Sequence, residues 1–546
     1  MEQGQIVMSF VDKAKAQYEA FKIAMLQSGI GSTIKKNNFL LFKSKKRAHM
    51  KSAVQVAKQF KYDSSLLGQL FIAAQTRKGD LDQIFKHESQ ASPPSLSNDG
   101  KLYAGQKSDL LHEIMDTCNN ANKLSTAATD DGIVDNVPGS FDAVIWDGGH
   151  LIHGVPPKGN MVTFQDYANE TFLPVIRRTL RDCDRVDIVW DEYRCDSLKA
   201  LTRLERGTGV RQLVRPFAKI PKNWNEFLRD SKNKTELFKY LSEEVRGMHV
   251  LESKVVYATY GAGVINVGEG PPMTDCLHEE ADTRVIVHLV HAINSGMKSV
   301  LIKTGDTDVV AILCGQYHRL QQSAKVWIAF GSGKHQQNID LGVIFTSFGP
   351  KDCVSMPLFH ALTGCDTTSA FRTKGKKMCM ATWKKNPWFS DVLVELATNP
   401  FNQITMDSQE FHEIETFISN LYSSEGTNVN QVRKSMFCHT TQDLRRLPPT
   451  RDALLQHCKR VVYQGGIWTQ AHDPQVVPPS PEQFGWHKDA SGAWNPVWIT
   501  IDTIPSATKE LTKCACKKVC KSCKCMKLNM PCTALCKCPC KFGSAV

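Results

Sequence analysis

The sequence lacks any long apolar run. None of its 546 residues falls in a window close to the roughly 18 consecutive apolar residues that a membrane-spanning helix needs. The first segment, MEQGQIVMSFVDKAKAQYEAF, also lacks a basic stretch followed by an apolar core and a cleavage site. We therefore expect no membrane contact and no secretion, and we expect the cysteines to stay reduced rather than form a disulfide framework.

Acidic residues are missing from the last 36 residues, which nevertheless contain eight lysines and nine of the 19 cysteines. Removing those eight charges from the net charge of +12 leaves only +4 for the rest of the chain. The other ten cysteines are scattered without a regular spacing, so we interpret them as ordinary buried thiols. The two cysteine populations thus require separate explanations.

The length exceeds what one hydrophobic core supports, and a composition of 42% hydrophobic and 22% charged residues is typical of folded protein. We expect two or more folded units and find no internal repeat. A Ser-, Pro- and Gly-rich stretch after residue 90 indicates a linker. The expected regions are a helical N-terminal region with its linker (1–110), an α/β domain (140–385), a helical and then irregular Trp- and Pro-rich region (386–510) and the cysteine-rich tail (511–546).

Short β-rich runs alternate with helical stretches between residues 140 and 385. DAVIW, VDIVW, KSVLIKT and KVWIAF are each too short for a helix and do not alternate with polar residues, which indicates strands buried on both faces. Amphipathic segments such as EADTRVIVHLVHAINSG separate them. The pattern predicts an α/β fold with a mainly parallel, twisted sheet covered by helices on both faces.

Acidic residues follow several of the predicted strands directly. In open α/β sheets ligands bind beyond the carboxyl ends of the strands, so we expect these acids to meet at one edge. The apolar stripe of the helix after residue 280 places Asp282 at the same rim; Glu279 joins it if the helix begins early, and Glu280 turns inward if it begins later. The candidate ligands are Asp147, Asp191, Glu280, Asp282, Asp306, Asp308 and Asp366.

Such a group of carboxylates is tolerable only if cations bind it, because like charges repel strongly. Oxygen-only ligands favour Mg²⁺ or Mn²⁺ over zinc. Two such ions would activate a water molecule and hold both oxygens of an in-line phosphoryl displacement, which predicts phosphodiester hydrolysis. Each acid taken alone is more simply a helix cap or a solvated loop residue, so the prediction rests on their joint placement.

Basic residues follow two of the acidic motifs. Lys199, Arg203 and Arg206 recur at helical spacing after Asp191 and are candidates for holding the scissile phosphate. An exposed basic helix explains the spacing about as well. Further candidate nucleic-acid contacts are Arg211, Arg215, Lys374, Lys376 and Lys377.

The order of these motifs resembles the flap-endonuclease branch of the PIN-like nucleases. The resemblance covers about residues 141–385 and rests on a first-strand Asp147, a second-strand Asp191 followed by a Lys/Arg helix, the EAD helix start, the D-x-D strand end and the L-x-G-x-D turn at Asp366. It implies a structure-specific, two-metal nuclease with Lys199 and Arg203 or Arg206 at the phosphate. It also implies that residues 222–247 form an arch or cap over the nucleic acid.

The tail has the pattern C-A-C-x3-C-x2-C-K-C-x6-C-x3-C-K-C-P-C, which indicates thiolate zinc binding. From spacing alone, nine ligands suit either two zinc sites with one spare cysteine or a cluster with bridging sulfurs. The pattern resembles the tesmin-type CXC module, which implies three Zn²⁺ in a DNA-binding unit. The ligands are Cys514, Cys516, Cys520, Cys523, Cys525, Cys532, Cys536, Cys538 and Cys540.

These features together predict a nuclear, metal-dependent nuclease that acts on nucleic acid, with DNA favoured over RNA, and that the tail recruits. The whole layout also resembles predicted proteins of multicopy, mobile-element-derived genes in animals. Two alternatives stay open: a non-catalytic DNA- or chromatin-binding protein with a PIN-like scaffold, and an RNA-directed PIN nuclease.

Overall fold

The structure is a computed structural model in which the chain divides into two compact units, residues 1–62 and 63–546. It describes residues 80–125, 138–194, 196–199, 209–320, 322–333, 336–423, 426, 428–439, 443–504, 511–520 and 522–540, with isolated positions at 19, 68–69, 72–73 and 77. Most of the predicted N-terminal helices, and both Arg203 and Arg206, lie outside the described residues. The strands and helices named here all belong to the second unit.

A seven-stranded sheet with the order β6-β5-β4-β3-β7-β8-β9 forms the centre of this unit. Neighbouring strands from β5 to β8 are parallel, and only the two edge strands, β6 and β9, pair antiparallel to their neighbours. This arrangement confirms the predicted mainly parallel sheet. The strands are β3 (Ala143–Asp147), β4 (Arg185–Val189), β5 (Val255–Tyr260), β6 (Gly263–Val267), β7 (Ser299–Thr304), β8 (Lys325–Phe330) and β9 (Gln337–Asp340).

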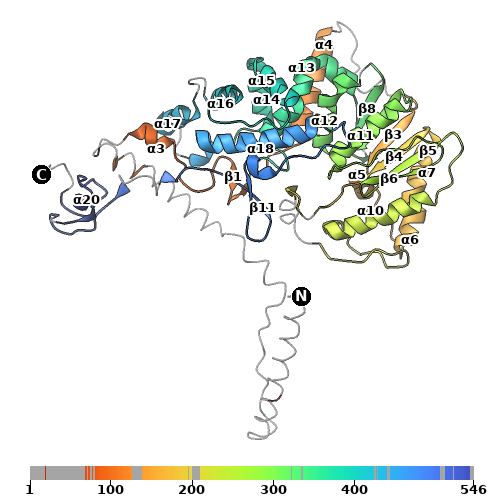
Figure 1. The fold of residues 1–546 in the computed structure, drawn as a ribbon, viewed down its shortest axis with the longest axis horizontal. Helices are drawn as coiled ribbons and strands as arrows, with labels where there is room; N and C mark the ends of the chain where they lie inside the picture. The colour runs from red at the N-terminus through yellow and green to blue at the C-terminus, as the bar shows by residue number, and fades with distance from the viewer. Residues whose placement is uncertain are drawn as a thin grey trace. The chain divides into compact units, whose positions relative to one another are not determined.

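Helices cover both faces of the sheet (Figure 1), because side chains from alternate strand positions enter two different cores. Ile145 and Ile302 pack under the first helical layer, whereas Val144 and Ile188 pack under the second. The first layer contains α4 (Asp109–Ser125), α11 (Ala281–Asn294), α12 (Thr307–Gln316) and α13 (Leu341–Leu362). The second contains α5 (Gly148–Gly154), α6 (Phe164–Tyr167), η2 (Ala168–Phe172), α7 (Leu173–Arg181), α9 (Trp224–Phe227) and α10 (Ser231–Arg246).

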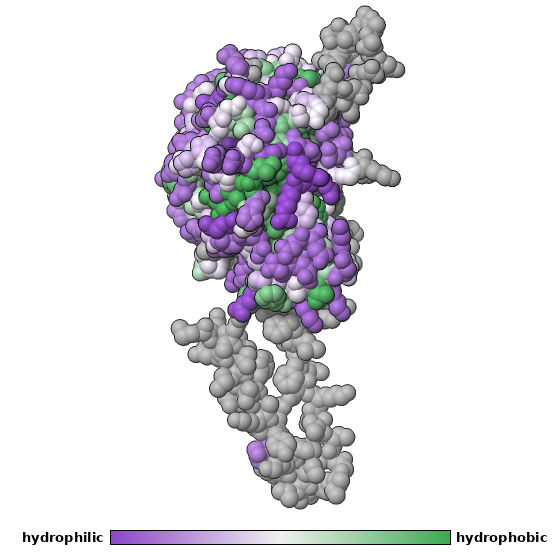
Figure 2. Space-filling model, turned by 90° about the vertical axis from the view of Figure 1, so that its right-hand side faces the viewer, coloured by the Kyte–Doolittle hydropathy of each residue, from purple (hydrophilic) through white to green (hydrophobic). Residues whose placement is uncertain are grey.

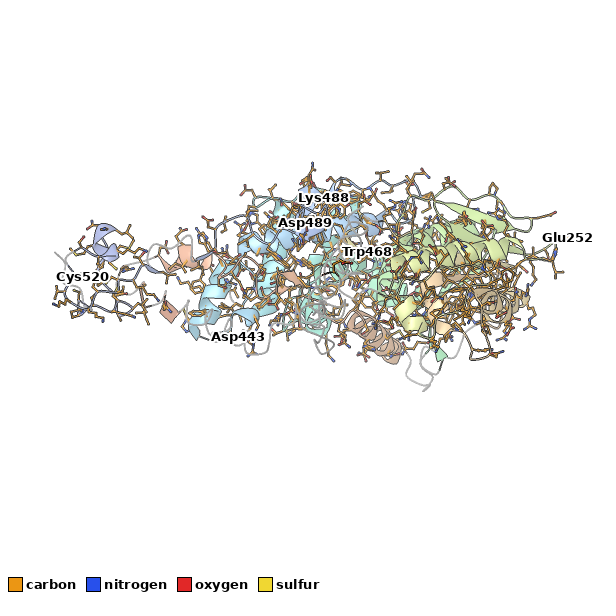
Figure 3. The ribbon with its side chains drawn as sticks, turned by 90° about the horizontal axis from the view of Figure 1, so that it is seen from below. Glu252, Asp443, Trp468, Lys488, Asp489 and Cys520 are labelled. Carbon is orange, nitrogen blue, oxygen red and sulfur yellow. The ribbon has the colours of Figure 1, made fainter. Side chains whose placement is uncertain are left out.

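The predicted helical and Trp/Pro-rich region beyond residue 386 shares the core of the first helical layer rather than forming a core of its own. Trp468, which Figure 3 labels, lies in α18 (Arg451–Thr469) and is completely buried. Its ring stacks on that of His360 in α13. The region follows α14 (Lys376–Lys385), and its helices are α15 (Phe389–Thr398), α16 (Gln409–Tyr422), α17 (Val429–His439) and α18. A small hairpin of β10 (Trp486–Lys488) and β11 (Trp494–Pro496) follows.

The Ser- and Pro-rich stretch after residue 90 is packed against the unit and is not a free linker. Leu96 is completely buried, and the backbone N–H of Ala370 donates to the carbonyl of Tyr103 at 2.8 Å. The stretch contains the two-residue strands β1 (Ser97–Asn98) and β2 (Lys101–Leu102) and lies between α3 (Leu81–Phe85) and α4. The composition of this stretch indicates a boundary between domains. Its backbone is nevertheless held by contacts to the loop after α13.

The segment predicted to be an arch or cap packs one face of its main helix on the sheet. In α10, Leu237, Leu241 and Val245 are completely buried in the second core, so this helix covers the face of the sheet. The expected amphipathic helix is present, and its apolar stripe packs on the sheet. The remaining short helices are η3 (Tyr317–Arg319), η5 (Leu444–Arg446), η6 (Pro481–Phe484) and α20 (Lys524–Lys527).

The described helices include none that is both long and apolar enough to cross a membrane. Figure 2 shows one face of the molecule, which is mainly hydrophilic and has a band of hydrophobic residues near its centre.

Candidate metal centre

The predicted acids gather where three adjacent parallel strands end. Asp147 is the last residue of β3, Asp191 follows β4 by two residues, and Asp306 follows β7 by two residues. All three line one cavity of about 340 Å³ together with Glu280, Asp282 and Asp366. The strand order β4-β3-β7 therefore produces the predicted convergence, because parallel strands present their carboxyl ends at the same edge.

Asp147 is buried between two neutral hydrogen-bond donors. Its carboxylate accepts from the backbone N–H of His150, at the start of α5, at 3.1 Å, and from the hydroxyl of Thr304, at the end of β7, at 2.8 Å. Burial and the neighbouring charge of Asp191 raise the pKa of Asp147 to about 7. The carboxyl group thus lies in a place where an extra positive charge would stabilise its ionised form.

Asp191 caps the helix that carries the next two acids. One of its oxygens accepts from the backbone N–H of Ala281, the first residue of α11, at 2.9 Å, and the other accepts from the hydroxyl of Tyr193 at 2.8 Å. The helix begins at Ala281, so Glu280 is the N-cap residue, yet its side chain makes no capping bond. Because Asp191 takes that role, Glu280 is available to turn into the cavity, which is the later-starting case of the prediction.

Asp282 lies on the buried side of the first turn of α11 and meets the acids after β7. Oxygen atoms of Asp282, Asp306 and Asp308 lie within 4.8 Å of one another. Burial, with repulsion from Asp306, raises the pKa of Asp282 well above its usual range. Asp306 itself caps α12 by accepting from the backbone N–H of Asp308 at 2.9 Å.

His360 orients Asp308 and was not predicted from the sequence. Both side chains are completely buried, and the imidazole Nε2 lies 2.8 Å from Asp308 Oδ1. Burial lowers the pKa of His360 to about 4, so the ring is neutral at neutral pH and donates Nε2–H to the carboxylate. A neutral histidine behind an acidic ligand is a common outer partner of metal sites. The only feature of the sequence that indicates this role is the position of His360, which lies in the predicted helix that leads to Asp366 and precedes Asp366 by six residues.

Asp366 enters the cavity from a glycine turn after α13. Gly364 has a φ of +106°, which favours glycine, and a Cβ at this position would lie 2.7 Å from Ala370. The turn directs Asp366 back towards the ends of β3 and β7, where it lines the cavity. The L-x-G-x-D pattern therefore has a direct physical explanation.

Two lysines lie among these acids, and only one of them was predicted. Lys199 contacts Glu280 at 2.8 Å and Asp282 at 3.4 Å. Lys107, which lies just before α4 and outside the predicted α/β domain, contacts Asp306, Asp308 and Asp366 at 3.0–3.3 Å. No local pattern around Lys107 indicates this position, because the contact joins segments about 200 residues apart.

The donor set fits a hard divalent cation. Asp308 lies behind the cavity, and Lys234 lines it in addition to Lys199, while Lys107 contacts the acids from one side. Negative charge remains in excess, because seven carboxylates line the cavity: those of Asp147, Asp191, Glu279, Glu280, Asp282, Asp306 and Asp366. Oxygen donors of this kind suit Mg²⁺ or Mn²⁺. The residues that would hold such an ion are Asp147, Asp191, Glu280, Asp282, Asp306, Asp308 and Asp366.

The candidate nucleic-acid contacts divide into exposed and internal residues. Arg211, Arg215 and Lys377 are exposed, although Arg211 is tied to Asn233 and Glu236 near the start of α10. Lys374 is half-buried, and its ammonium lies over the ring of Tyr422. These positions leave Arg215 and Lys377 as the most accessible of the predicted contacts.

The prediction for Lys376 is wrong. Its side chain is buried, and its ammonium donates to the carbonyl of His360 at 3.1 Å and to the hydroxyl of Thr363 at 2.8 Å. Burial lowers the pKa of Lys376 to about 8. The residue thus ties the start of α14 to the end of α13 and is closed to nucleic acid.

The nine tail cysteines form one compact group of free thiols. Four sets of three or four of them bring their sulfurs within 4.8 Å of one another, and every one of the nine belongs to at least one set. Cys514 belongs to three sets and Cys520, shown in Figure 3, to two. Because some cysteines belong to more than one set, sulfurs that bridge two metal ions are favoured over separate sites. Thiolate ligands of this kind fit zinc. The described lysines of the tail are all exposed around this cluster.

Comparisons with known proteins add little to this geometry. No protein family matches the sequence, and no curated protein matches it. Among solved structures, one match is the crystal structure of T5 D15 protein co-crystallised with metal ions, at 13% identity and a TM-score of 0.28. That match covers 61% of this chain and 99% of the other. Similarity at this level carries no argument, so the functional conclusion rests on the site itself.

Proposed function

We propose that this protein is a nuclease that depends on Mg²⁺ or Mn²⁺ and hydrolyses phosphodiester bonds in nucleic acid, with DNA the favoured substrate. The observation that carries the proposal is the gathering of seven carboxylates from three strand ends, the start of α11 and the turn after α13 around one cavity. Buried carboxylates without matching positive charge are costly, so their assembly favours a bound cation.

The side chains of the cavity have complementary roles in this proposal. A divalent ion held by the carboxylates would lower the pKa of a bound water and withdraw charge from the phosphate oxygens. Lys199 lies beside Glu280 and Asp282 and is proposed to hold the scissile phosphate, together with Arg203 and Arg206 from outside the described residues. His360 keeps Asp308 oriented, and Asp191 fixes the start of α11.

We propose that the tail binds three Zn²⁺ as a CXC-like module and recruits the protein to DNA in the nucleus. Its described lysines are exposed, so they are available for phosphate contacts. In the double variant Cys525→Ser and Cys538→Ser we expect lost zinc and DNA affinity weaker by at least about tenfold at moderate salt. Zinc content measured by emission spectroscopy and binding measured by fluorescence anisotropy test this role.

The decisive experiment compares cleavage of labelled flap DNA, duplex DNA, single-stranded DNA and single-stranded RNA, with Mg²⁺ or with EDTA. We expect Mg²⁺-dependent cleavage of DNA that Asp306→Asn reduces by at least about a hundredfold. Asparagine still caps α12, so the melting temperature should stay close to that of the wild type.

Glu252→Gln is the matched control, because Glu252 is exposed, precedes β5 at the opposite end of the strands and is visible in Figure 3. Full activity of Asp306→Asn would contradict the proposed site. Cleavage of RNA alone would favour the RNA-directed alternative, and binding without cleavage of any substrate would favour the scaffold.

A further inference from the structure

Lys107 neutralises one half of the acidic site. Its ammonium lies 3.3 Å from Asp306, 3.0 Å from Asp308 and 3.2 Å from Asp366. These three acids, the paired half of the site, come from the link between β7 and α12, from α12 itself and from the turn after α13. One positive charge therefore lies at the point where three carboxylates converge, which is the arrangement that a metal ion would require.

The backbone that carries Lys107 is fixed to the loop that carries Asp366. The carbonyl of Tyr103 accepts from Ala370 at 2.8 Å, and the guanidinium of Arg372 stacks on the Tyr103 ring at 4.4 Å. A Cβ at Gly105 would lie 2.6 Å from that of Ala370, so only glycine permits this approach. The lysine thus projects from a stem that is built into the site.

The helix that follows strengthens this attachment. The backbone N–H of Leu110 donates to the carbonyl of Lys107 at 3.1 Å, so Lys107 lies at the entry to α4. Leu110 and Ile114 are completely buried in the core that also contains α12 and α13. Movement of the Lys107 backbone would therefore require α4 to leave the core, whereas its side chain alone can rotate.

The other half of the site differs. Asp147 and Asp191, the open half, make no ion pair within the part of the chain that the structure describes, and their hydrogen bonds come from neutral donors. Asp282 lies between the halves and pairs with Lys199. The two halves therefore present unequal environments to a cation: among the described residues no ammonium pairs directly with the open half, and the paired half already contains one.

We propose that Lys107 is a built-in cation of the paired half, so that the protein binds one divalent ion tightly at the open half and a second only when the ammonium is displaced. The inference rests on the proposed metal site and specifies how that site is loaded. An ammonium and a divalent ion cannot share the same three carboxylates without strong repulsion, so removing the lysine charge should improve binding of the second ion.

The test counts Mn²⁺ bound to the zinc-loaded full chain by electron paramagnetic resonance, without nucleic acid and without an activity readout. We expect the wild type to bind one ion tightly and a second at least about tenfold more weakly. In Lys107→Met, which keeps most of the length of the side chain and removes its charge, we expect the second ion to bind at least about tenfold more tightly than in the wild type.

Two further variants serve as controls. Lys107→Arg retains the charge, so the first Mn²⁺ should still bind more tightly than the second, by the same factor as in the wild type. Lys325→Met removes an exposed lysine at the amino end of β8, opposite the site, and should also behave as the wild type. Adding Asp366→Asn to Lys107→Met should weaken only the second ion, since Asp366 belongs to the paired half.

The outcomes separate this inference from the proposed function. Equal binding of two ions by the wild type, or identical titrations of the wild type and Lys107→Met, would overturn the role of Lys107 and leave the nuclease proposal standing. Absence of Mn²⁺ binding to both proteins, with circular dichroism showing folded chains, would overturn the metal site and the inference with it.

Discussion

Two groups of buried charged residues lie where β4 packs on α11, one at each end of the strand. In one group the charges are paired, whereas in the other the acids outnumber the bases. At the amino end of β4, Arg185 and Asp187 form a double ion pair with both contacts at 2.7 Å, and His288 of α11 lies 2.7 Å from the same aspartate. At the carboxyl end of β4, Asp191 meets Glu280 and Asp282 at the start of α11, beside the cavity. The same pair of elements thus carries a balanced group and an acidic one.

The balanced group is closed. Arg185, Asp187 and His288 are all buried, and the guanidinium also lies 4.3 Å from the ring centre of Tyr257. Burial opposes ionisation of Asp187, but Arg185 outweighs it and lowers the pKa of Asp187 to about 2. Every charge there has a partner within the fold. The acidic group has a surplus of negative charge that faces a cavity, which indicates a ligand outside the chain.

The largest effect should follow from breaking the balanced group. Asp187→Asn leaves the Arg185 charge buried without its partner, so we expect the free energy of unfolding to fall by about 3–5 kcal/mol. Urea denaturation measures this change. Replacing both partners, with Arg185→Met and Asp187→Leu together, should cost less than the single change. A single variant as stable as the wild type would show that the pair contributes little to stability.

The opposite result is expected at the acidic end. Asp282→Asn removes like-charge repulsion, so without metal the protein should be as stable as the wild type or slightly more stable. At a Mn²⁺ concentration a hundred times the dissociation constant, the free energy of unfolding of the wild type should rise by about 2.7 kcal/mol. In the variant most of this increase should be absent. Urea denaturation with and without Mn²⁺ measures both values. An equal gain in the two proteins would exclude Asp282 as a ligand.

Acid should weaken the balanced group by a smaller amount. The folded-state pKa of Asp187 is about 2, below the unfolded value of about 3.9, so its stabilisation is complete above the unfolded pKa and disappears as the pH falls through the folded one. We expect the difference in unfolding free energy between the wild type and Asp187→Asn to be constant above about pH 5. Between about pH 4 and 2 it should shrink by about 2 kcal/mol. A difference that does not change with pH would contradict the assigned ion pair.

The smallest effect concerns a neutral residue behind the acids. The hydroxyl of Thr304 donates to Asp147 at 2.8 Å and accepts from the backbone N–H of Asp306 at 3.1 Å. Thr304→Val keeps the shape and removes both bonds, so we expect a loss of about 1 kcal/mol in stability and about tenfold in Mn²⁺ affinity. Thr398→Val, at an exposed position on α15, is the control and should change neither quantity. Unchanged Mn²⁺ affinity in Thr304→Val would show that Thr304 does not support the ligands.

Much of the acidic end was predictable because its signals are local. Short unalternated apolar runs indicated buried parallel strands, and the acids after three of these runs mark the strand ends. Asp282 was predicted from the stripe of α11, since helical spacing alone places it at the rim. The positions of Gly364 and Asp366 follow from a turn that needs glycine. The nine cysteines are a local signal of the same kind.

Other features depend on contacts between segments far apart in the chain. The balanced group was not predicted, because Arg185 and Asp187 stand in an apolar run and their partner His288 lies about 100 residues later. Lys376 was predicted to contact nucleic acid, but the packing of α14 against α13 encloses it. Nor does composition show that residues 90–110 pack against the loop after α13.

The sequence by itself therefore determined the class of fold, the edge of the sheet where the acids meet and the grouping of the tail thiols, since chain periodicity and strand direction are local properties. Only the tertiary structure decided which charges are matched. It placed Lys107 among three acids, His360 behind Asp308 and Asp191 at the start of α11. Electrostatic balance depends on distance in space, and these three contacts join residues that are about 50 to 260 positions apart in the chain.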